Sequence, residues 1–134
     1  SEQWVAAVAR DAGAPHAILE KVRHGDRTVE VSVPDLERWP GHTPVLVDDI
    51  VSTARTMIET LRHLAKMRAK PAVCIAVHGI FAGSAYRDLL EAGATRVVTL
   101  NTVPHESNAI DVTGLLAGAI RDLMQSPLPP QGAA

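Results

Sequence analysis

The chain has 134 residues, a net charge of −2 and only 3% aromatic residues, whereas 46% of its residues are hydrophobic. This length predicts one domain with a substantial hydrophobic core. The weak charge and the scarcity of aromatic side chains argue against nucleic acid or an anionic membrane as a general partner. No apolar run is long enough to span a bilayer and no secretory signal is evident, so we expect a cytoplasmic protein.

The first third of the sequence predicts a helix followed by a β-hairpin. Apolar residues recur at helical spacing over residues 1–13, and Gly13 suits the left-handed conformation that ends many helices. Two strand-like runs follow at residues 16–20 and 28–33, with the turn signal Gly25-Asp26 between them. The connection contains four basic side chains, which fit a solvated loop and a functional arm equally well: Lys21, Arg23, His24 and Arg27.

One stretch near the middle of the chain has the most informative order of residues. The apolar residues 45–47 predict a strand buried on both faces, and this strand stops at the adjacent carboxylates Asp48 and Asp49. Small and hydroxyl residues follow at 52–56, here called the hydroxyl loop, and a helical pattern runs from about residue 53 to 67. This order places acceptors and donors together at the carboxyl end of a strand, where open parallel sheets bind ligands.

The same stretch suits a ligand with a phosphate at one end and vicinal hydroxyls at the other. N–H groups at a helix start are unpaired and the helix dipole is positive there, so they attract a phosphate, and the hydroxyls of the loop and Arg55 add donors. Carboxylates accept hydrogen bonds from sugar hydroxyls. These properties predict a pentose 5-phosphate site. The simpler interpretation is that Asp48 and Asp49 end a strand and that Ser52 or Thr53 caps a helix.

The second half of the chain predicts the alternating strands and helices of a parallel α/β sheet. The expected elements are a strand at 71–77, a helix at 84–92, a strand at 96–100 and a last helix from Asp111 or Thr113 to Met124. Right-handed crossovers bring the ends of the three central strands to one edge of the sheet: Asp48-Asp49, His78-Gly79 and Asn101-Thr102. Cys74, the only cysteine, is expected to be a buried structural thiol. The domain is expected to span residues 1–125, followed by a disordered tail at 126–134.

These motifs together resemble a known family. The segment Val45-Leu46-Val47-Asp48-Asp49-Ile50-Val51-Ser52-Thr53-Ala54-Arg55-Thr56 resembles the phosphoribosyl diphosphate binding motif of type I phosphoribosyltransferases. Within that superfamily, the sequence is most similar to ribose-phosphate pyrophosphokinases, also called phosphoribosyl diphosphate synthetases. The similar segments cover nearly the whole chain and include residues 19–23, 78–83, 101–105 and 111–117.

The resemblance implies an α/β fold with a mostly parallel sheet flanked by helices and a β-hairpin that acts as a catalytic arm. It implies transfer of diphosphate from ATP, bound as its Mg²⁺ complex, to ribose 5-phosphate, giving phosphoribosyl diphosphate and AMP. No residue of this chain is assigned as a metal ligand. By resemblance, Lys21 and Arg23 are catalytic, and the residues that bind ribose 5-phosphate are Arg23, Asp48, Asp49, Ser52, Thr53, Ala54, Arg55 and Thr56.

The sequence departs from the family pattern in two respects. The family usually has glycine in place of Arg55 and often in place of Ala54, and arginine disfavours backbone conformations that glycine adopts easily. Synthetases of this type also have two similar domains, whereas no stretch here resembles the adenine pocket or the acidic metal segment. We therefore expect this chain to correspond to the C-terminal domain and to be inactive without the N-terminal half of the same protein. The resemblance further implies a homo-oligomer.

Two other functions stay open. A phosphoribosyltransferase that consumes phosphoribosyl diphosphate and a base would need a hood over the base, and no segment suggests one. A non-catalytic regulatory homologue would keep the fold without the chemistry; Arg55 favours it, whereas Lys21 and Arg23 argue against it. Neither His78, which is more often structural at a strand end, nor His105, which could belong to a subunit contact or effector pocket, receives a role from the sequence.

Overall fold

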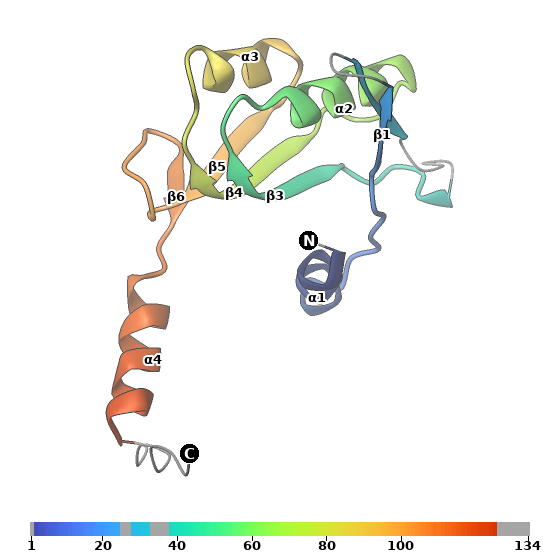
Figure 1. Ribbon diagram of the computed structural model, residues 1–134. Coiled ribbons are helices and arrows are strands. Elements are labelled where there is room, and N and C mark those ends of the chain that lie inside the picture. The colour runs from blue at the N-terminus through green and yellow to red at the C-terminus, as the bar shows by residue number, and fades with distance from the viewer. Residues whose placement is uncertain (1, 25–27, 33–37, 126–134) are drawn as a thin grey trace, which may run out of the picture.

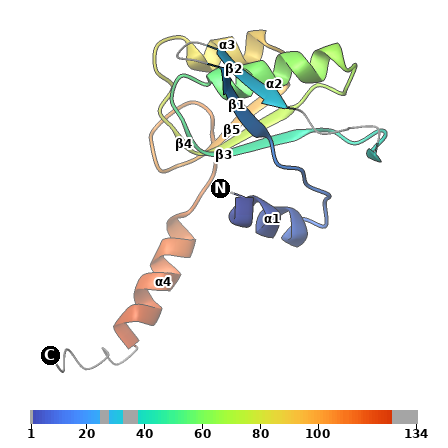
Figure 2. The ribbon, with the colours of Figure 1, turned by 45° about the vertical axis from the view of Figure 1, so that its right-hand side comes forward.

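The computed structural model describes residues 2–24, 28–32 and 38–125. Their central feature is a four-stranded sheet with the strand order β3-β4-β5-β6. Helices α2 and α3 cover one face of this sheet, and α1 and α4 lie on its other side (Figures 1 and 2). A separate two-stranded sheet, β1-β2, lies beside α2.

All neighbouring strands of the large sheet run parallel. The strands are β3 (Val45–Val51), β4 (Val73–Gly79), β5 (Arg96–Leu100) and β6 (Asn108–Ile110), and the covering helices are α2 (Arg55–Lys66) and α3 (Ala85–Glu91). This arrangement confirms the predicted α/β fold with a parallel sheet flanked by helices. Strand β6 was not predicted, because a run of three residues is too short to show a strand pattern.

The hydrophobic core lies between the sheet and the two helices α2 and α3. Leu61 and Leu64 of α2 recur at helical spacing and are almost completely buried, and Leu89 of α3 is fully buried. Each such leucine contributes about 2 kcal/mol by leaving water, so this layer holds both helices on the sheet. Cys74 of β4 lies in the same layer, as predicted, and burial raises the pKa of its thiol to about 11.

Strand β3 differs from the prediction in two ways. It is an edge strand rather than a strand buried on both faces, and Val45 and Ile50 are 52% and 53% exposed. It also continues through Asp48 and Asp49 to Val51 instead of stopping at the carboxylates. The reason is that β4 offers hydrogen-bonding partners along its whole length, and the pairing extends to the last residue of β3.

The predicted hairpin is confirmed, but its first strand is shifted. Strand β1 (Glu20–His24) pairs antiparallel with β2 (Thr28–Ser32), whereas the sequence suggested a strand at residues 16–20. The register leaves only three residues between the strands, a usual length for a hairpin connection. Lys21 and Arg23 therefore belong to a strand and not to the loop that was expected to hold them.

The two terminal helices lie away from the core layer. Helix α1 (Glu2–Asp11) is confirmed, and Gly13 has the expected left-handed φ of 64°. Helix α4 (Thr113–Gln125) extends away from the sheet and buries none of its residues (Figure 2). Its exposed apolar side chains are Leu115, Leu116, Ile120, Leu123 and Met124.

Within the described ranges, no helix combines the length and the apolar character needed to cross a membrane. The predicted tail at 126–134 lies outside the described residues.

Candidate functional site at the carboxyl edge of the sheet

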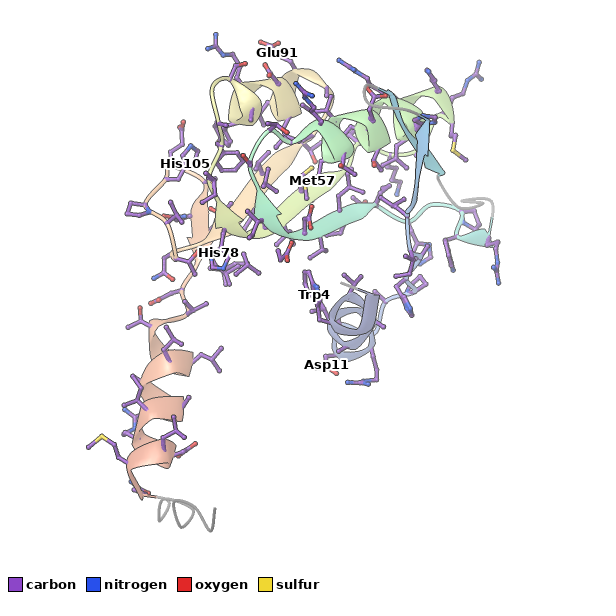
Figure 3. All side chains as sticks on the ribbon, viewed as in Figure 1. Trp4, Asp11, Met57, His78, Glu91 and His105 are labelled. Atoms are coloured by element: carbon purple, nitrogen blue, oxygen red, sulfur yellow. The ribbon has the colours of Figure 1, made fainter. Side chains whose placement is uncertain are left out.

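The carboxyl ends of β3, β4 and β5 meet at one edge of the sheet, as predicted, and this edge is called the carboxyl edge below. His78 of β4 pairs in register with Ile50, the residue after Asp49. The Nδ1 atom of His78 lies 2.8 Å from the hydroxyl of Thr102, which follows β5 and also donates to the Val77 carbonyl. Figure 3 shows the His78 ring at the end of β4. Carboxylates, an imidazole and a hydroxyl from three strands thus lie at one edge.

Each carboxylate of the acidic pair on β3 accepts a hydrogen bond from the backbone N–H of the following residue. The Asp48 carboxylate accepts the N–H of Asp49 at 3.0 Å, and the Asp49 carboxylate accepts the N–H of Ile50 at 2.8 Å. A hydrogen bond with the Asp48 side chain and that from the Ile50 N–H hold the pKa of Asp49 below its ordinary value. Asp49 is therefore an ionised, exposed acceptor at neutral pH, suited to hydroxyl donors. No three His, Cys, Asp or Glu side chains of the described residues gather as a metal ion would require.

The hydroxyl loop connects the acidic pair to the start of α2. Ser52 and Thr53 are exposed, and α2 begins at Arg55, two residues later than the sequence suggested. The preceding residue, Ala54, is buried and has a left-handed φ of 57°, and no side chain caps the helix. The first N–H groups of α2 have no partner within the helix, so this end of α2 can receive an anion.

The unusual Arg55 has an ordinary backbone. It is the first residue of α2 and its side chain is exposed, so the steric objection to arginine at this position does not hold. The left-handed conformation falls on Ala54 instead, where the related motif often has glycine. For a residue with a Cβ this conformation costs about 1–2 kcal/mol. Of the two positions where the family has glycine, Ala54 and not Arg55 is thus the one that strains the backbone.

Backbone hydrogen bonds from the loop after β4 hold the beginning of the hydroxyl loop in place. The carbonyl of Val51 accepts the N–H groups of Ile80 and Phe81 at 3.0 and 3.1 Å, and the carbonyl of Ser52 accepts the N–H of Ala82 at 3.0 Å. These three bonds join two segments that lie almost thirty positions apart in the sequence. They hold the strand end and the first residue of the hydroxyl loop in one position relative to the sheet.

Gly79, at the end of β4, is required for packing rather than for contact with a ligand. A Cβ built on it would lie 2.5 Å from Cε2 of Phe81 and 2.8 Å from Cγ2 of Thr99. A glycine at a strand end can let the backbone approach a ligand closely, but at Gly79 the side chains of Phe81 and Thr99 occupy that space. Phe81 itself adopts a φ of 41°, which turns the chain toward α3.

A partly buried cluster of polar and aromatic side chains behind the carboxyl edge was not predicted from the sequence. The ring of His105 lies 4.6 Å from that of Phe81 and 4.8 Å from that of Tyr86, measured between centroids. Its Nδ1 accepts the N–H of Ser107, whose hydroxyl lies 2.8 Å from that of buried Thr99. His105 thus stabilises the loop after β5. Its suggested place in a subunit contact or effector pocket stays a prediction.

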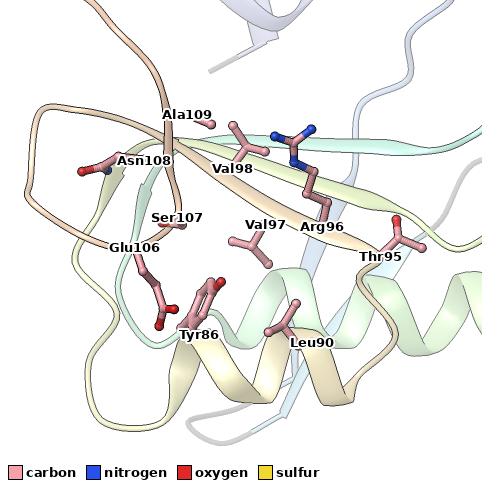
Figure 4. A pocket seen from close by; sticks show the side chains of 10 residues that line it. All are labelled: Tyr86, Leu90, Thr95, Arg96, Val97, Val98, Glu106, Ser107, Asn108 and Ala109. Atoms are coloured by element: carbon pink, nitrogen blue, oxygen red, sulfur yellow. The ribbon is translucent and has the colours of Figure 1, made fainter.

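A pocket of about 400 Å³ lies beside this cluster, between α3 and the β5-β6 side of the sheet (Figure 4). Its lining consists of Tyr86, Leu90, Thr95, Arg96, Val97, Val98, Glu106, Ser107, Asn108 and Ala109. None of the residues predicted from the sequence to bind a ligand lines it. The candidate site at the carboxyl edge and this pocket are therefore distinct features of the fold.

The predicted catalytic residues are only partly placed. Lys21 and Arg23 lie in β1, and β1 and β2 form a sheet of their own that is not hydrogen-bonded to the large sheet. The side chains of β1 lie outside the described residues, so the structure assigns no contact to Lys21 or Arg23. Their catalytic role, and that of Arg23 in substrate binding, stay predictions.

Comparison with known proteins agrees with the fold. Residues 1–115 match the phosphoribosyl transferase domain family, and the chain belongs to this family. A crystal structure of the phosphoribosylpyrophosphate synthetase from Mycobacterium smegmatis is similar, with a TM-score of 0.66 and 28% identity, over 92% of this chain and 40% of that chain.

Several similar curated proteins are ribose-phosphate pyrophosphokinases. The one from Sulfurisphaera tokodaii is 32% identical over 118 residues, which are 87% of this chain and 40% of that protein. Ribose-phosphate pyrophosphokinase 2 from Saccharomyces cerevisiae is 34% identical over 88 residues, which are 62% of this chain and 28% of that protein. The chain thus spans at most about 40% of the length of these relatives.

Proposed function

We propose that this chain is the part of a ribose-phosphate pyrophosphokinase that binds ribose 5-phosphate. The parent enzyme would transfer diphosphate from ATP to the 1-hydroxyl of this sugar. The observation that carries the proposal is the β3-α2 junction, where Asp48 and Asp49 precede a helix start that no side chain caps. The similarity to proteins of that name supports it.

The junction would orient the substrate by charge. The 5-phosphate would bind the N–H groups at the start of α2, with donors from Ser52, Thr53 and Thr56. Arg55 could add a charge-assisted bond, because its exposed side chain belongs to the first turn. The carboxylates would repel a phosphate and accept hydrogen bonds from the ribose hydroxyls. The sugar phosphate can then lie in only one direction across the edge.

The diphosphoryl transfer itself would need positive charge from elsewhere. Negative charge develops on the transferring phosphate oxygens, and Lys21 and Arg23 are the residues proposed to stabilise it. A lysine supplies a point charge, an arginine supplies a planar fork for two oxygens, and closure of the hairpin would exclude water. The second substrate, the Mg²⁺ complex of ATP, would bind largely to an N-terminal half of the same protein. We further propose a homo-oligomer in the cytoplasm.

The two alternatives differ in what they require of the same fold. A phosphoribosyltransferase would release pyrophosphate from phosphoribosyl diphosphate only when a nucleobase is present. A regulatory homologue would bind the sugar phosphate weakly or not at all. Arg55 was its main support, and the helical backbone of Arg55 weakens that support.

The direct test is a titration of the chain with ribose 5-phosphate, followed through its backbone amide resonances. We expect the largest shifts at residues 52–56 and their loss in Asp48→Asn. The matched control is Asp11→Asn, at the exposed end of α1, which should bind like the wild-type chain. Wild-type shifts that spread evenly over the chain, or that survive Asp48→Asn, would count against the site.

In the full-length parent, the role of the arm is tested separately. Lys21→Ala should lower kcat far more than it raises the dissociation constant for ribose 5-phosphate, because the lysine is proposed to act on the transferring group. Equal losses of turnover and sugar binding would contradict that role.

A further inference from the structure

The hydrogen bonds around Thr102 define which nitrogen of His78 carries a proton. The Thr102 hydroxyl donates its single proton to the Val77 carbonyl at 2.8 Å, because a carbonyl can only accept. The same hydroxyl oxygen lies 2.8 Å from Nδ1 of His78. Both bonds form together only if the hydroxyl oxygen accepts a proton from Nδ1. The geometry therefore assigns the Nδ1–H form to His78.

Thr102 is held where it makes these bonds. Its neighbour Asn101 donates its backbone N–H to the Ile110 carbonyl at 3.0 Å and its side-chain amide to Asp111 at 2.7 Å. The side-chain oxygen of Asn101 accepts the N–H of Val112 at 3.0 Å. The loop after β5 is thus joined on both sides to the segment before α4. It presents Thr102 to His78 as a fixed partner.

The second ring nitrogen is left as an acceptor at the carboxyl edge. In a neutral ring with Nδ1–H, Nε2 has a lone pair and no proton. Nε2 points away from Nδ1 and hence from Thr102, and it has no hydrogen-bond partner among the described residues. His78 is the register partner of Ile50, and neighbouring strands lie about 4.8 Å apart. An uncommitted acceptor therefore lies on the strand next to the one that carries the acidic pair, at the same edge of the sheet.

We propose that His78 binds the sugar of the substrate, with Nε2 accepting a hydrogen bond from a sugar hydroxyl while Thr102 fixes the ring. This assignment rests on the proposed function and adds a sugar-binding residue, His78, and a positioning residue, Thr102, to it. The Nε2 lone pair favours a hydroxyl over a phosphate oxygen, because an unprotonated nitrogen cannot donate to an oxygen that only accepts. The effect should therefore concern the sugar and not the phosphate.

The first test needs no ligand. A long-range ¹H–¹⁵N spectrum of the histidine rings, recorded well above the ordinary histidine pKa of about 6.5, distinguishes the protonated from the unprotonated nitrogen. We expect the Nδ1–H form for His78 in the wild-type chain and in Thr102→Ser, and a shift toward the Nε2–H form in Thr102→Val, which lacks the hydroxyl. An Nε2–H form in the wild-type chain would overturn the assignment.

The second test compares ribose 5-phosphate with inorganic phosphate as probes. His78→Asn keeps an amide that can bond to Thr102 but has no atom at the position of Nε2. We expect it to bind ribose 5-phosphate about three- to tenfold more weakly, the worth of one hydrogen bond, and inorganic phosphate as well as the wild type does. His78→Gln, which places a polar atom near Nε2, should recover part of the loss. The control is His42→Asn, at the amino end of the sheet, with no expected change.

The outcomes separate this assignment from the proposed function. If the wild-type chain binds ribose 5-phosphate and His78→Asn binds it equally well, the role of His78 is wrong and the proposed site stands. Equal weakening for both probes would also overturn it, since that would indicate a structural defect. If the wild-type chain does not bind ribose 5-phosphate at all, the proposed function and this assignment fail together.

Discussion

Helices α2 and α4 have similar lengths and apolar residues at helical spacing, yet only α2 of the two buries its apolar face. Helix α2 has 12 residues and buries Met57, Thr60, Leu61 and Leu64 against the sheet. Helix α4 has 13 residues and buries none. The period of the apolar residues specifies which face of a helix is apolar, but not whether a neighbour covers that face. The strongest effects on folding should therefore come from the α2 side of the sheet, and α4 should respond locally.

The largest expected difference is between one leucine of each helix. Leu61→Ala should lower the free energy of unfolding by about 2–5 kcal/mol, because it leaves a cavity in the core. Leu123→Ala in α4, where the side chain is 72% exposed, should change it by less than about 0.5 kcal/mol. Urea unfolding of the chain measures both values. A cost for Leu123→Ala close to that of Leu61→Ala would show that α4 is covered in solution and would remove the contrast.

The buried thiol of Cys74, beneath α2, predicts that the chain loses stability at alkaline pH. Burial raises the pKa of Cys74 to about 11 in the folded chain, against an ordinary value of 9.0 for a thiol in the unfolded chain. Because the folded state prefers the neutral thiol, this contribution is present in full below pH 9 and is lost as the pH rises toward 11. One unit of pKa corresponds to about 1.4 kcal/mol, so the loss over this range should be of order 2–3 kcal/mol. Cys74→Ala should remove this pH dependence. An unchanged dependence in that variant would contradict the prediction.

Alanine substitutions at two glycines, one at the end of β4 and one in α4, test the same contrast between the core side of the sheet and α4. Gly79→Ala should destabilise the chain by about 1–3 kcal/mol, because the new methyl group would overlap Phe81 and Thr99. Gly118→Ala in α4 meets no atom within 4 Å and should stabilise the helix by about 0.5–1 kcal/mol. Thermal unfolding distinguishes the two signs. Tolerance of alanine at Gly79 would mean that the ring of Phe81 can move away from β4.

The smallest effect is expected at the start of α4. Asp111 accepts the N–H of Thr113 at 2.8 Å, and hydrogen bonds from the Thr113 side chain and backbone and from Asn101 lower the pKa of Asp111. Its capping contribution should be complete above the ordinary carboxyl pKa and disappear as the pH falls through the lowered value. Asp111→Ala should speed amide exchange in the first turn of α4 and leave the urea midpoint nearly unchanged. A large shift of the midpoint would show that α4 folds together with the core.

Much of the fold could be predicted because its signals are local. The continuous apolar runs of β4 and β5 and the helical spacing in α2 were located within two residues of their observed bounds. The first strand of the hairpin was misplaced, because residues 16–20 and Glu20–His24 are both compatible with a strand and only the pairing with β2 decides between them. Three-residue β6 has no pattern of its own.

The candidate site was predicted in its residues but not in its geometry. The order of Asp48, Asp49 and the hydroxyl loop indicated a sugar-phosphate site, and the convergence of three strand ends followed from right-handed crossovers. The sequence could not show that Ala54, and not Arg55, takes the left-handed conformation. That choice depends on where α2 begins, which the bonds from the loop after β4 help to set.

The sequence alone specifies the order of the strands and helices other than β6, the apolar faces of α2 and α4, the acidic and hydroxyl motif and the family. For the described residues, the tertiary structure decides that β3 is an edge strand, that α4 buries none of its residues, and that Gly79 makes room for Phe81. It also decides that His78 meets Thr102, 24 positions away. Patterns of period 2 or 3.6 encode contacts within one element. Burial and hydrogen bonds between distant segments depend on which elements become neighbours, and that is a property of the assembled sheet.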